Sequence, residues 1–344
     1  MENTNRKSWI AVANVCSCLG VIILHCNGVF WQFPTGRLWY TSNFIETLFY
    51  WSAPVFFMIS GATLLDYRER YSTGIYFKKR LLRTLVPFIF WSIVSVIYRY
   101  YYCDWEFESL RDTLNGIINT KFMAVYWFFP SLFAVYMAIP LLSAVEKATR
   151  LTVFILISGL TFVFNSALPV IFSLIGLEYN SSIQIPVTGG YLIYVLLGYI
   201  ISTIEMQFTG RLIVYFLGVV GFLTQFFGTN FLSLSSGEIV QTFKGYLNFP
   251  AVLQSVAVFT LFKYSCRKLK SNKIERICLK LSKYTFGVYL THYYFVDKLP
   301  LLMNINAGSI YWRTVGAIFI FIISTILCYV LSKIPMLRKC IGLS

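Results

Sequence analysis

Two histidines draw attention because each lies in an apolar run typical of a membrane segment. His25 ends the stretch GVIILH, His292 ends the stretch GVYLTH, and the chain has only these two. An imidazole titrates near neutrality, so it can take a proton from a hydroxyl group and later return it. Charged or titratable groups inside a membrane are costly and are therefore candidates for function. Both histidines are candidate catalytic residues, although His292 alone also fits a structural hydrogen-bonding role.

One acidic residue, Glu46, begins the second apolar segment near the outer level expected for His25. As a candidate catalytic residue it would orient an imidazole; as a structural residue it would lie at the membrane interface. Asp297 follows His292 by five residues, a spacing that does not place the two side chains on the same face of a helix.

A basic cluster, KKRLLR at residues 78–83, precedes the third apolar run. Such a cluster commonly marks the inner side of a membrane helix and contacts lipid phosphates. Lys79 and Arg83 are four residues apart, however, and should share one helix face. Together with Arg80, they form a candidate site for the phosphate groups of a ligand.

The composition indicates that these residues belong to a membrane protein. Of the 344 residues, 57% are hydrophobic and only 12% are charged, about half the charged fraction of a soluble domain. Apolar runs long enough to cross a bilayer recur along the chain. We therefore predict an all-α polytopic membrane helical bundle, a single domain over residues 1–344. The ten predicted membrane helices are 9–30, 44–65, 82–102, 122–144, 151–175, 187–204, 211–230, 247–264, 283–299 and 311–333.

The distribution of basic residues predicts that both termini are cytoplasmic. If the N-terminus is inside, only seven of the 29 Lys and Arg residues fall in outer segments or at outer helix ends: Arg37, Arg99, Arg111, Lys121, Lys244, Lys298 and Arg313. This asymmetry follows the positive-inside rule. The net charge of +15 then reflects topology and contact with the lipid bilayer rather than binding of nucleic acid. We expect a multi-pass protein of the cell (plasma or inner) membrane.

The segments between the predicted helices are short, so no separate catalytic module is expected. Residues 103–121 could form an amphipathic helix at the membrane interface, and the Ser- and Gly-rich residues 231–246 are predicted to be a flexible outer loop. The eight cysteines show no zinc or disulfide spacing, and no metal site is expected. No internal repeat is visible, which weakens an interpretation as an inverted-repeat transporter.

Five motifs, in order, give the chain a resemblance to the acyltransferase-3 family of bacterial integral-membrane acyltransferases. They are VIILH at 21–25, PVFFMISGATLL at 54–65, KKRLLRTLVPF at 78–88, YWFFPSLFAVYMAIPLL at 126–142 and FGVYLTHYYF at 286–295. The first is similar to the family's first-helix histidine motif. The third matches its R-x-x-x-R element, with Lys79 in the first basic position and Arg83 in the second. A departure is Asn14, where many members carry an arginine eleven residues before the histidine.

The resemblance implies a membrane-bound O-acyltransferase. The donor would be cytoplasmic acyl-CoA, acetyl-CoA in the first instance, and the acceptor an extracytoplasmic glycan or lipid-linked sugar. Lys79, Arg80 and Arg83 would hold the CoA phosphates, and His25 would act as general base or carry the acyl group. One alternative is a transporter or flippase for a small solute or lipid-linked sugar, in which His25 and Glu46 couple to protons. A second is an assembly protein of an envelope complex.

Overall fold

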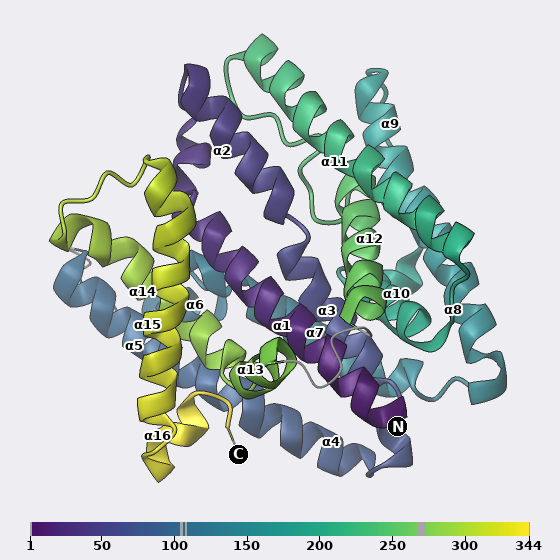
Figure 1. The fold of residues 1–344 in the computed structure, drawn as a ribbon, viewed down its shortest axis with the longest axis horizontal. Helices are drawn as coiled ribbons and strands as arrows, with labels where there is room; N and C mark the ends of the chain where they lie inside the picture. The colour runs from purple at the N-terminus through teal and green to yellow at the C-terminus, as the bar shows by residue number, and fades with distance from the viewer. Residues whose placement is uncertain (1, 104–105, 107–108, 267–272, 344) are drawn as a thin grey trace.

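A central helix organises the bundle. The computed structural model describes residues 2–103, 106, 109–266 and 273–343, and every regular element in these residues is helical. Helix α1 (Glu2–Cys26) runs through the middle of the molecule (Figure 1). It packs against α2 (Gly36–Phe49), α3 (Ser52–Leu64), α12 (Phe249–Ser265), α13 (Lys273–Leu281), α14 (Thr285–Leu302) and α15 (Ala317–Leu331). Residues of α1 therefore contact helices from both the first and the last parts of the chain.

The remaining helices surround this centre. They are α4 (Thr73–Arg80), α5 (Val86–Tyr102), α6 (Leu110–Ile118), α7 (Phe128–Leu142), α8 (Lys147–Thr161), α9 (Leu168–Leu174), α10 (Leu192–Thr203), α11 (Phe208–Ser236) and α16 (Pro335–Cys340). Short 3-10 and π-helical stretches join several of them into longer rods. One such stretch, Leu81–Leu85, is π-helical and joins α4 to α5.

Seven helical rods within the described residues are long and apolar enough to cross a membrane. They are Ser8–Gln32, Gly36–Glu69, Thr73–Tyr102, Ala124–Leu142, Lys147–Leu174, Phe208–Ser236 and Trp312–Leu331. Each of the ten predicted segments overlaps helical residues. The count of ten spanning helices is not confirmed, however, because α10 is a shorter apolar helix and neither α12 nor α14 is among the seven.

The two faces of α11 differ in a way that indicates that its exposed face contacts lipid. Its buried positions are small or polar: Gly218, Gly221, Gln225, Thr229, Asn230 and Ser233. Its exposed positions are large and apolar, for example Phe216, Phe227 and Phe231, which are 61–72% exposed. Helices in a membrane pack through small residues and polar side chains because lipid and apolar side chains are equally hydrophobic. The bundle is therefore that of a membrane protein.

Close packing of α3 on α10 gives a physical reason for the Ser-Gly pair in PVFFMISGATLL. A Cβ atom on Gly61 would overlap the main-chain carbonyl of Val195, and one on Gly198 would overlap that of Met58. The two helices thus touch backbone to backbone, an approach that only glycine permits. Ser60, the neighbour of Gly61, lies on the wall of a cavity described below.

Two predicted boundaries are wrong. The second segment begins at Gly36 rather than at 44 and is broken between α2 and α3, where Pro54 lies in the first turn of α3 and lacks the N–H that would continue a helix. Of the predicted loop, 231–246, the first six residues are helical and the rest is irregular. Helix α11 continues to Ser236 and ends at Gly237, whose φ of 76° suits glycine. The chain then descends from the end of α11 toward the middle of the molecule (Figure 1).

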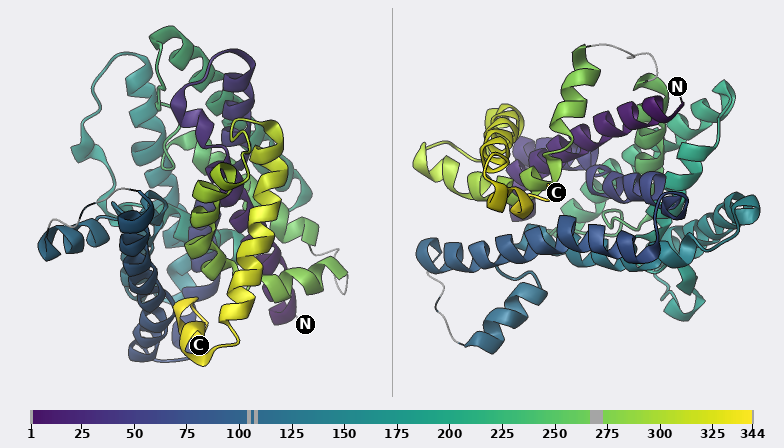
Figure 2. Two further views of the ribbon diagram at one scale, coloured as in Figure 1. Left: turned by 90° about the vertical axis from the view of Figure 1, so that its left-hand side faces the viewer. Right: turned by 90° about the horizontal axis from the view of Figure 1, so that it is seen from below.

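Within 103–121, the predicted amphipathic helix corresponds to α6, although residues 104–105 and 107–108 lie outside the described part. Leu110, Leu114 and Ile118 form an exposed apolar stripe along α6, which projects sideways from the body of the molecule (Figure 2). Of the basic residues counted on the inner side, Arg267, Lys268 and Lys270 also lie outside the described residues.

Both ends of the chain lie at the same end of the molecule (Figures 1 and 2). Combined with the charge asymmetry, this arrangement predicts that α16 is cytoplasmic and that the end of α5 faces outward. We expect a membrane-impermeant maleimide to label a variant whose only cysteine is Cys103 in intact cells. A variant whose only cysteine is Cys340 should react only after permeabilisation. The opposite pattern would reverse the predicted orientation.

Candidate active site

The two histidines, 267 residues apart in sequence, form a pair. The Nδ1 atom of His25, at the end of α1, lies 2.7 Å from the Nε2 atom of His292 in α14. The two rings are nearly parallel, with an interplanar angle of 9° and centroids 5.0 Å apart. His292 is fully buried, whereas His25 is half-buried and lines a cavity. The structure therefore brings together the two predicted catalytic histidines.

The contacts of His292 determine which nitrogen of His25 can act as a base. The Nδ1 atom of His292 lies 2.7 Å from the carbonyl oxygen of Tyr289 and 3.1 Å from that of Val288. Because carbonyl oxygens only accept, this nitrogen carries the hydrogen, and Nε2 of a neutral His292 is an acceptor. The 2.7 Å contact then requires His25 to donate from Nδ1. A neutral His25 is left with an unprotonated Nε2, the form needed to accept a proton.

His25 lines a cavity of about 510 Å³ in the half of the molecule that we predict to be outward. Glu46 from α2 and Lys244 from the segment between α11 and α12 line the same cavity. Aromatic side chains make up much of the remaining wall: Trp31, Tyr50, Trp127, Tyr246 and Tyr289. We call this space the outer cavity. It combines a basic nitrogen, one carboxylate and one ammonium group with flat aromatic surfaces.

Glu46 is only 3% exposed, so its carboxylate is enclosed by the bundle. Its Oε2 atom accepts a hydrogen bond of 3.3 Å from Asn27, and its Oε1 atom lies 3.1 Å from the Nζ atom of Lys244. Asn27 also accepts a 3.3 Å hydrogen bond from Arg313. Glu46 thus contacts the chain two residues beyond His25, and it supports the end of α1 through Asn27 rather than through the imidazole.

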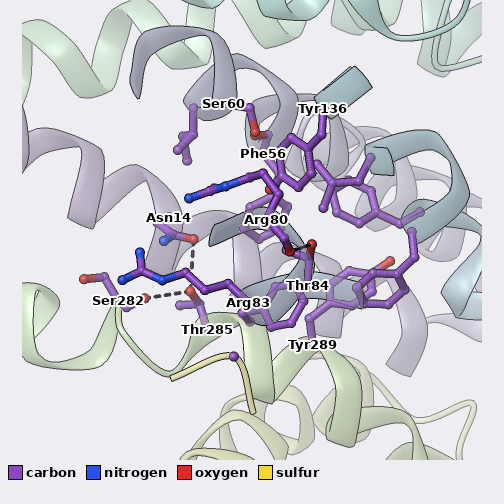
Figure 3. A pocket seen from close by; sticks show the side chains of 16 residues that line it. Asn14, Phe56, Ser60, Arg80, Arg83, Thr84, Tyr136, Ser282, Thr285 and Tyr289 are labelled. Atoms are coloured by element: carbon purple, nitrogen blue, oxygen red, sulfur yellow. Dashed lines mark hydrogen bonds between the residues drawn. The ribbon is translucent and has the colours of Figure 1, made fainter. Parts of the chain in front are cut away.

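A second space, which we call the inner cavity, lies closer to the two termini and measures about 310 Å³. Figure 3 shows the side chains of Arg80 and Arg83 extending into it beside Asn14 and Ser282. Thr285 donates a 3.1 Å hydrogen bond to the Oδ1 atom of Asn14. Two guanidinium groups and several neutral polar groups therefore line one concave surface, which suits a phosphate-bearing ligand.

Lys79 is placed differently from Arg80 and Arg83. Its Nζ atom lies 3.8 Å from the centroid of the Tyr71 ring, a cation–π contact, and Lys79 is not among the residues that line the inner cavity. The expectation that Lys79 and Arg83 share a face assumes a uniform helical period. That period changes in the π-helical stretch Leu81–Leu85. The residues that line the inner cavity are instead Arg80 and Arg83, three residues apart.

Tyr289 borders both cavities. Its hydroxyl donates a 2.8 Å hydrogen bond to the carbonyl oxygen of Val125, and its ring lies 5.3 Å from that of Phe128, centroid to centroid. Along α1, Asn14 of the inner cavity and His25 of the outer cavity are separated by about 16 Å at 1.5 Å per residue. The two cavities thus share Tyr289 as a residue of their walls.

Lys244 and Tyr289 are site residues that the sequence motifs do not predict, and the motifs leave the place of Asn14 open. The only signal for Lys244 is its position between aromatic residues in QTFKGYLNF, which is unusual for an exposed loop. Among the described residues, no group of three or more His, Cys, Asp or Glu side chains is placed to hold a metal ion.

The fold and the cavities define a helical membrane protein with a basic inner pocket and a histidine-bearing outer pocket. Comparison with known proteins gives the chemistry: a family model described as an acyltransferase domain, that of acyltransferase family 3, matches residues 7–333. The chain belongs to this family and is an acyltransferase. Neither the comparison with curated proteins nor that with solved structures finds a significant match.

The histidine pair leads to a prediction about activity. His25→Ala should lower acyl transfer by about 100- to 10,000-fold, the usual loss when a general base is removed. His292→Ala should cost less, because it removes the partner that fixes the tautomer and not the base itself. The double variant should be no slower than His25→Ala alone, since residues that act as one unit are not additive.

The measurement is the rate of acyl transfer per folded molecule, with the melting temperature and gel-filtration profile in detergent as controls for folding. Additive losses in the double variant would show that the two histidines act independently. Wild-type activity in His25→Ala would remove His25 from the mechanism.

Proposed function

We propose that this acyltransferase moves an acetyl group from cytoplasmic acetyl-CoA to a hydroxyl group of a cell-envelope glycan or lipid-linked sugar. The observation that carries the proposal is the presence of two cavities that both border Tyr289. One contains two guanidinium groups suited to phosphate, and the other contains a histidine whose Nε2 is free to accept a proton. The first-helix histidine motif and the family membership support the same reading.

In the proposed reaction, Arg80 and Arg83 bind the phosphate groups of acetyl-CoA at the cytoplasmic side. The pantetheine arm is an extended amide chain, and its length suffices for the separation of about 16 Å between the levels of Asn14 and His25. The thioester would thus reach the outer cavity while the nucleotide stays at the inner one. The acceptor sugar enters the outer cavity from the opposite side, where aromatic faces can pack against its ring.

The chemistry is a direct transfer. Nε2 of His25 takes the proton of the acceptor hydroxyl as its oxygen attacks the thioester carbonyl carbon. His292 holds the imidazole and stabilises the positive charge that His25 acquires. The carbon–sulfur bond then breaks, and the leaving thiolate takes the proton from His25, so that an ester and free CoA result. Glu46 contributes by fixing Asn27 at the end of α1.

Nothing in the family match or the two cavities favours the alternative of a transporter or flippase. The discriminating experiment uses inside-out membrane vesicles from cells with wild-type protein or with His25→Ala. With acetyl-CoA labelled in the acetyl group, we expect label on glycan in the wild-type vesicles only. Right-side-out vesicles, whose cytoplasmic face is closed to the donor, should incorporate none. Solute accumulation without labelled glycan would support a transporter instead.

The inner cavity yields a separate prediction about donor binding. Arg80→Ala and Arg83→Ala should each weaken binding of acetyl-CoA by roughly tenfold or more, since a hydrogen bond to a charged group is worth about 1.5–3 kcal/mol. Lys79→Ala is the matched control, because its ammonium group contacts Tyr71 outside the cavity. Binding is measured calorimetrically on purified protein. If Lys79→Ala weakens acetyl-CoA binding equally, Lys79 also binds the donor, as the sequence predicts, and its exclusion from the site is wrong.

A further inference from the structure

Lys244 is a buried charged group that the proposed function leaves without a role. Its side chain is 0% exposed, yet it lines the outer cavity. The Nζ atom forms an ion pair with Glu46, 3.1 Å from its Oε1 atom, and no other acceptor contacts it among the described residues. This contact uses at most one of the three N–H donors of the ammonium group. A buried ammonium group with unused N–H donors is destabilising unless another group binds them.

Aromatic rings surround this ammonium group. Nζ lies 4.1 Å from the centroid of Phe30, 4.6 Å from that of Tyr50 and 5.2 Å from that of Trp31. Cation–π contacts of this kind hold the charge in place, but they do not use N–H donors as an oxygen atom does. The ammonium is therefore fixed in position and still able to donate.

The side chain of Lys244 is not needed to hold its own segment in place. The hydroxyl of Tyr50 donates to the main-chain carbonyl of Lys244, and the hydroxyl of Tyr194 donates to that of Tyr246. These two bonds attach the backbone of the segment to Tyr50, which follows α2, and to α10. A lysine is thus not required at this position for anchoring, and its charge calls for a different explanation.

The position of Lys244 relative to His25 suggests a reason for its charge. Both residues line the outer cavity, His25 from the end of α1 and Lys244 from the segment that precedes α12. A short series of contacts links them: Asn27, two residues beyond His25, contacts Glu46, and Glu46 contacts Lys244. A reacting group in this cavity would therefore have a base on one side and a fixed positive charge within the same enclosure.

We propose that Lys244 is a catalytic residue that stabilises the oxyanion of acyl transfer. This inference rests on the proposed function. When the acceptor oxygen attacks the thioester carbonyl carbon, the carbonyl oxygen takes up the electron pair of the broken π bond. The Lys244 ammonium donates a hydrogen bond to that oxygen and remains protonated throughout. As the carbonyl re-forms, the thiolate leaves and takes its proton from His25. Preorganised donors in a water-poor site act most strongly on such developing charge.

The test separates catalysis from substrate binding. Lys244→Met keeps the length and apolar stem of the side chain and removes the charge. We expect kcat to fall about 100- to 1,000-fold, the loss typical of a missing oxyanion donor, while the KM for the acceptor and the Kd for acetyl-CoA stay within threefold. Lys244→Arg should recover part of the rate. Lys298→Met, at the predicted outer end of α14 and outside the cavity, should behave as wild type.

A second pair of variants addresses Glu46, which Lys244→Met leaves buried without its cation. Lys244→Met is also made in a Glu46→Gln background, where no unpaired charge remains and Asn27 can still donate to the amide oxygen. A loss of about 100-fold or more in both backgrounds supports the proposal. No loss in the Glu46→Gln background overturns it, because Lys244 would then act only by neutralising Glu46.

Two further results would also overturn the inference. A raised KM for the acceptor with unchanged kcat would show that Lys244 binds an anionic group of the substrate. A Lys244→Met variant with near-wild-type kcat would show that the charge has no part in the reaction. In both cases the wild-type protein still transfers acetyl groups, so the proposed function stands; if the wild type and Lys298→Met transfer none, it is the proposed function that fails.

Discussion

The hydrogen bond between His25 and His292 is the interaction on which the rest of the site depends. It joins α1 to α14, and it decides which nitrogen of His25 is basic. It has this effect only because the carbonyl oxygens of Val288 and Tyr289, one turn earlier in α14, accept the other N–H of His292. The two histidines are far apart in sequence, so the base is assembled only when the helices between them have packed. The site is therefore a property of the complete bundle.

A membrane makes this dependence stricter. Lipid offers no hydrogen bonds, so each polar group placed in the bundle must find its partner there. Near the outer cavity, Arg313 donates to Asn27 and to Thr41, and Asn27 in turn donates to Glu46. This connected set fixes the end of α1 just beyond His25. Several buried polar atoms lack a partner, but Lys244 differs from most of them in carrying a charge and in lining the outer cavity, where its ammonium group contacts Glu46 without a complete set of bonds. A charged group of this kind inside a membrane is a candidate for function.

Much of the fold could be predicted from the sequence because hydrophobicity and charge act locally. The ten apolar segments all contain helix, and His25 stands out as a polar residue in an apolar run. The pairing with His292 could not be predicted, because both histidines lie in similar runs and nothing local specifies which helices meet. Arg80 was assigned to the phosphate site, but its pairing with Arg83 in place of Lys79 depends on a π-helical stretch that has no clear sequence signal. Lys244 is hard to predict because the Ser- and Gly-rich stretch before it resembles an exposed loop, and only its aromatic neighbours indicate that the chain turns inward.

Tyr289 links the two halves of the proposed mechanism. Its main-chain oxygen holds His292, its hydroxyl holds the carbonyl of Val125, and its ring borders both cavities. A displacement of this residue would break the bond to Val125 and disturb the orientation of His292, so it would weaken the base just as the donor arrives. Phe56 and Phe128 line the inner cavity beside it, and a phenylalanine ring can rotate without loss of any hydrogen bond. For the proposed reaction we therefore expect the thioester arm to pass beside these two rings, while Tyr289 stays in place and keeps the histidine pair aligned.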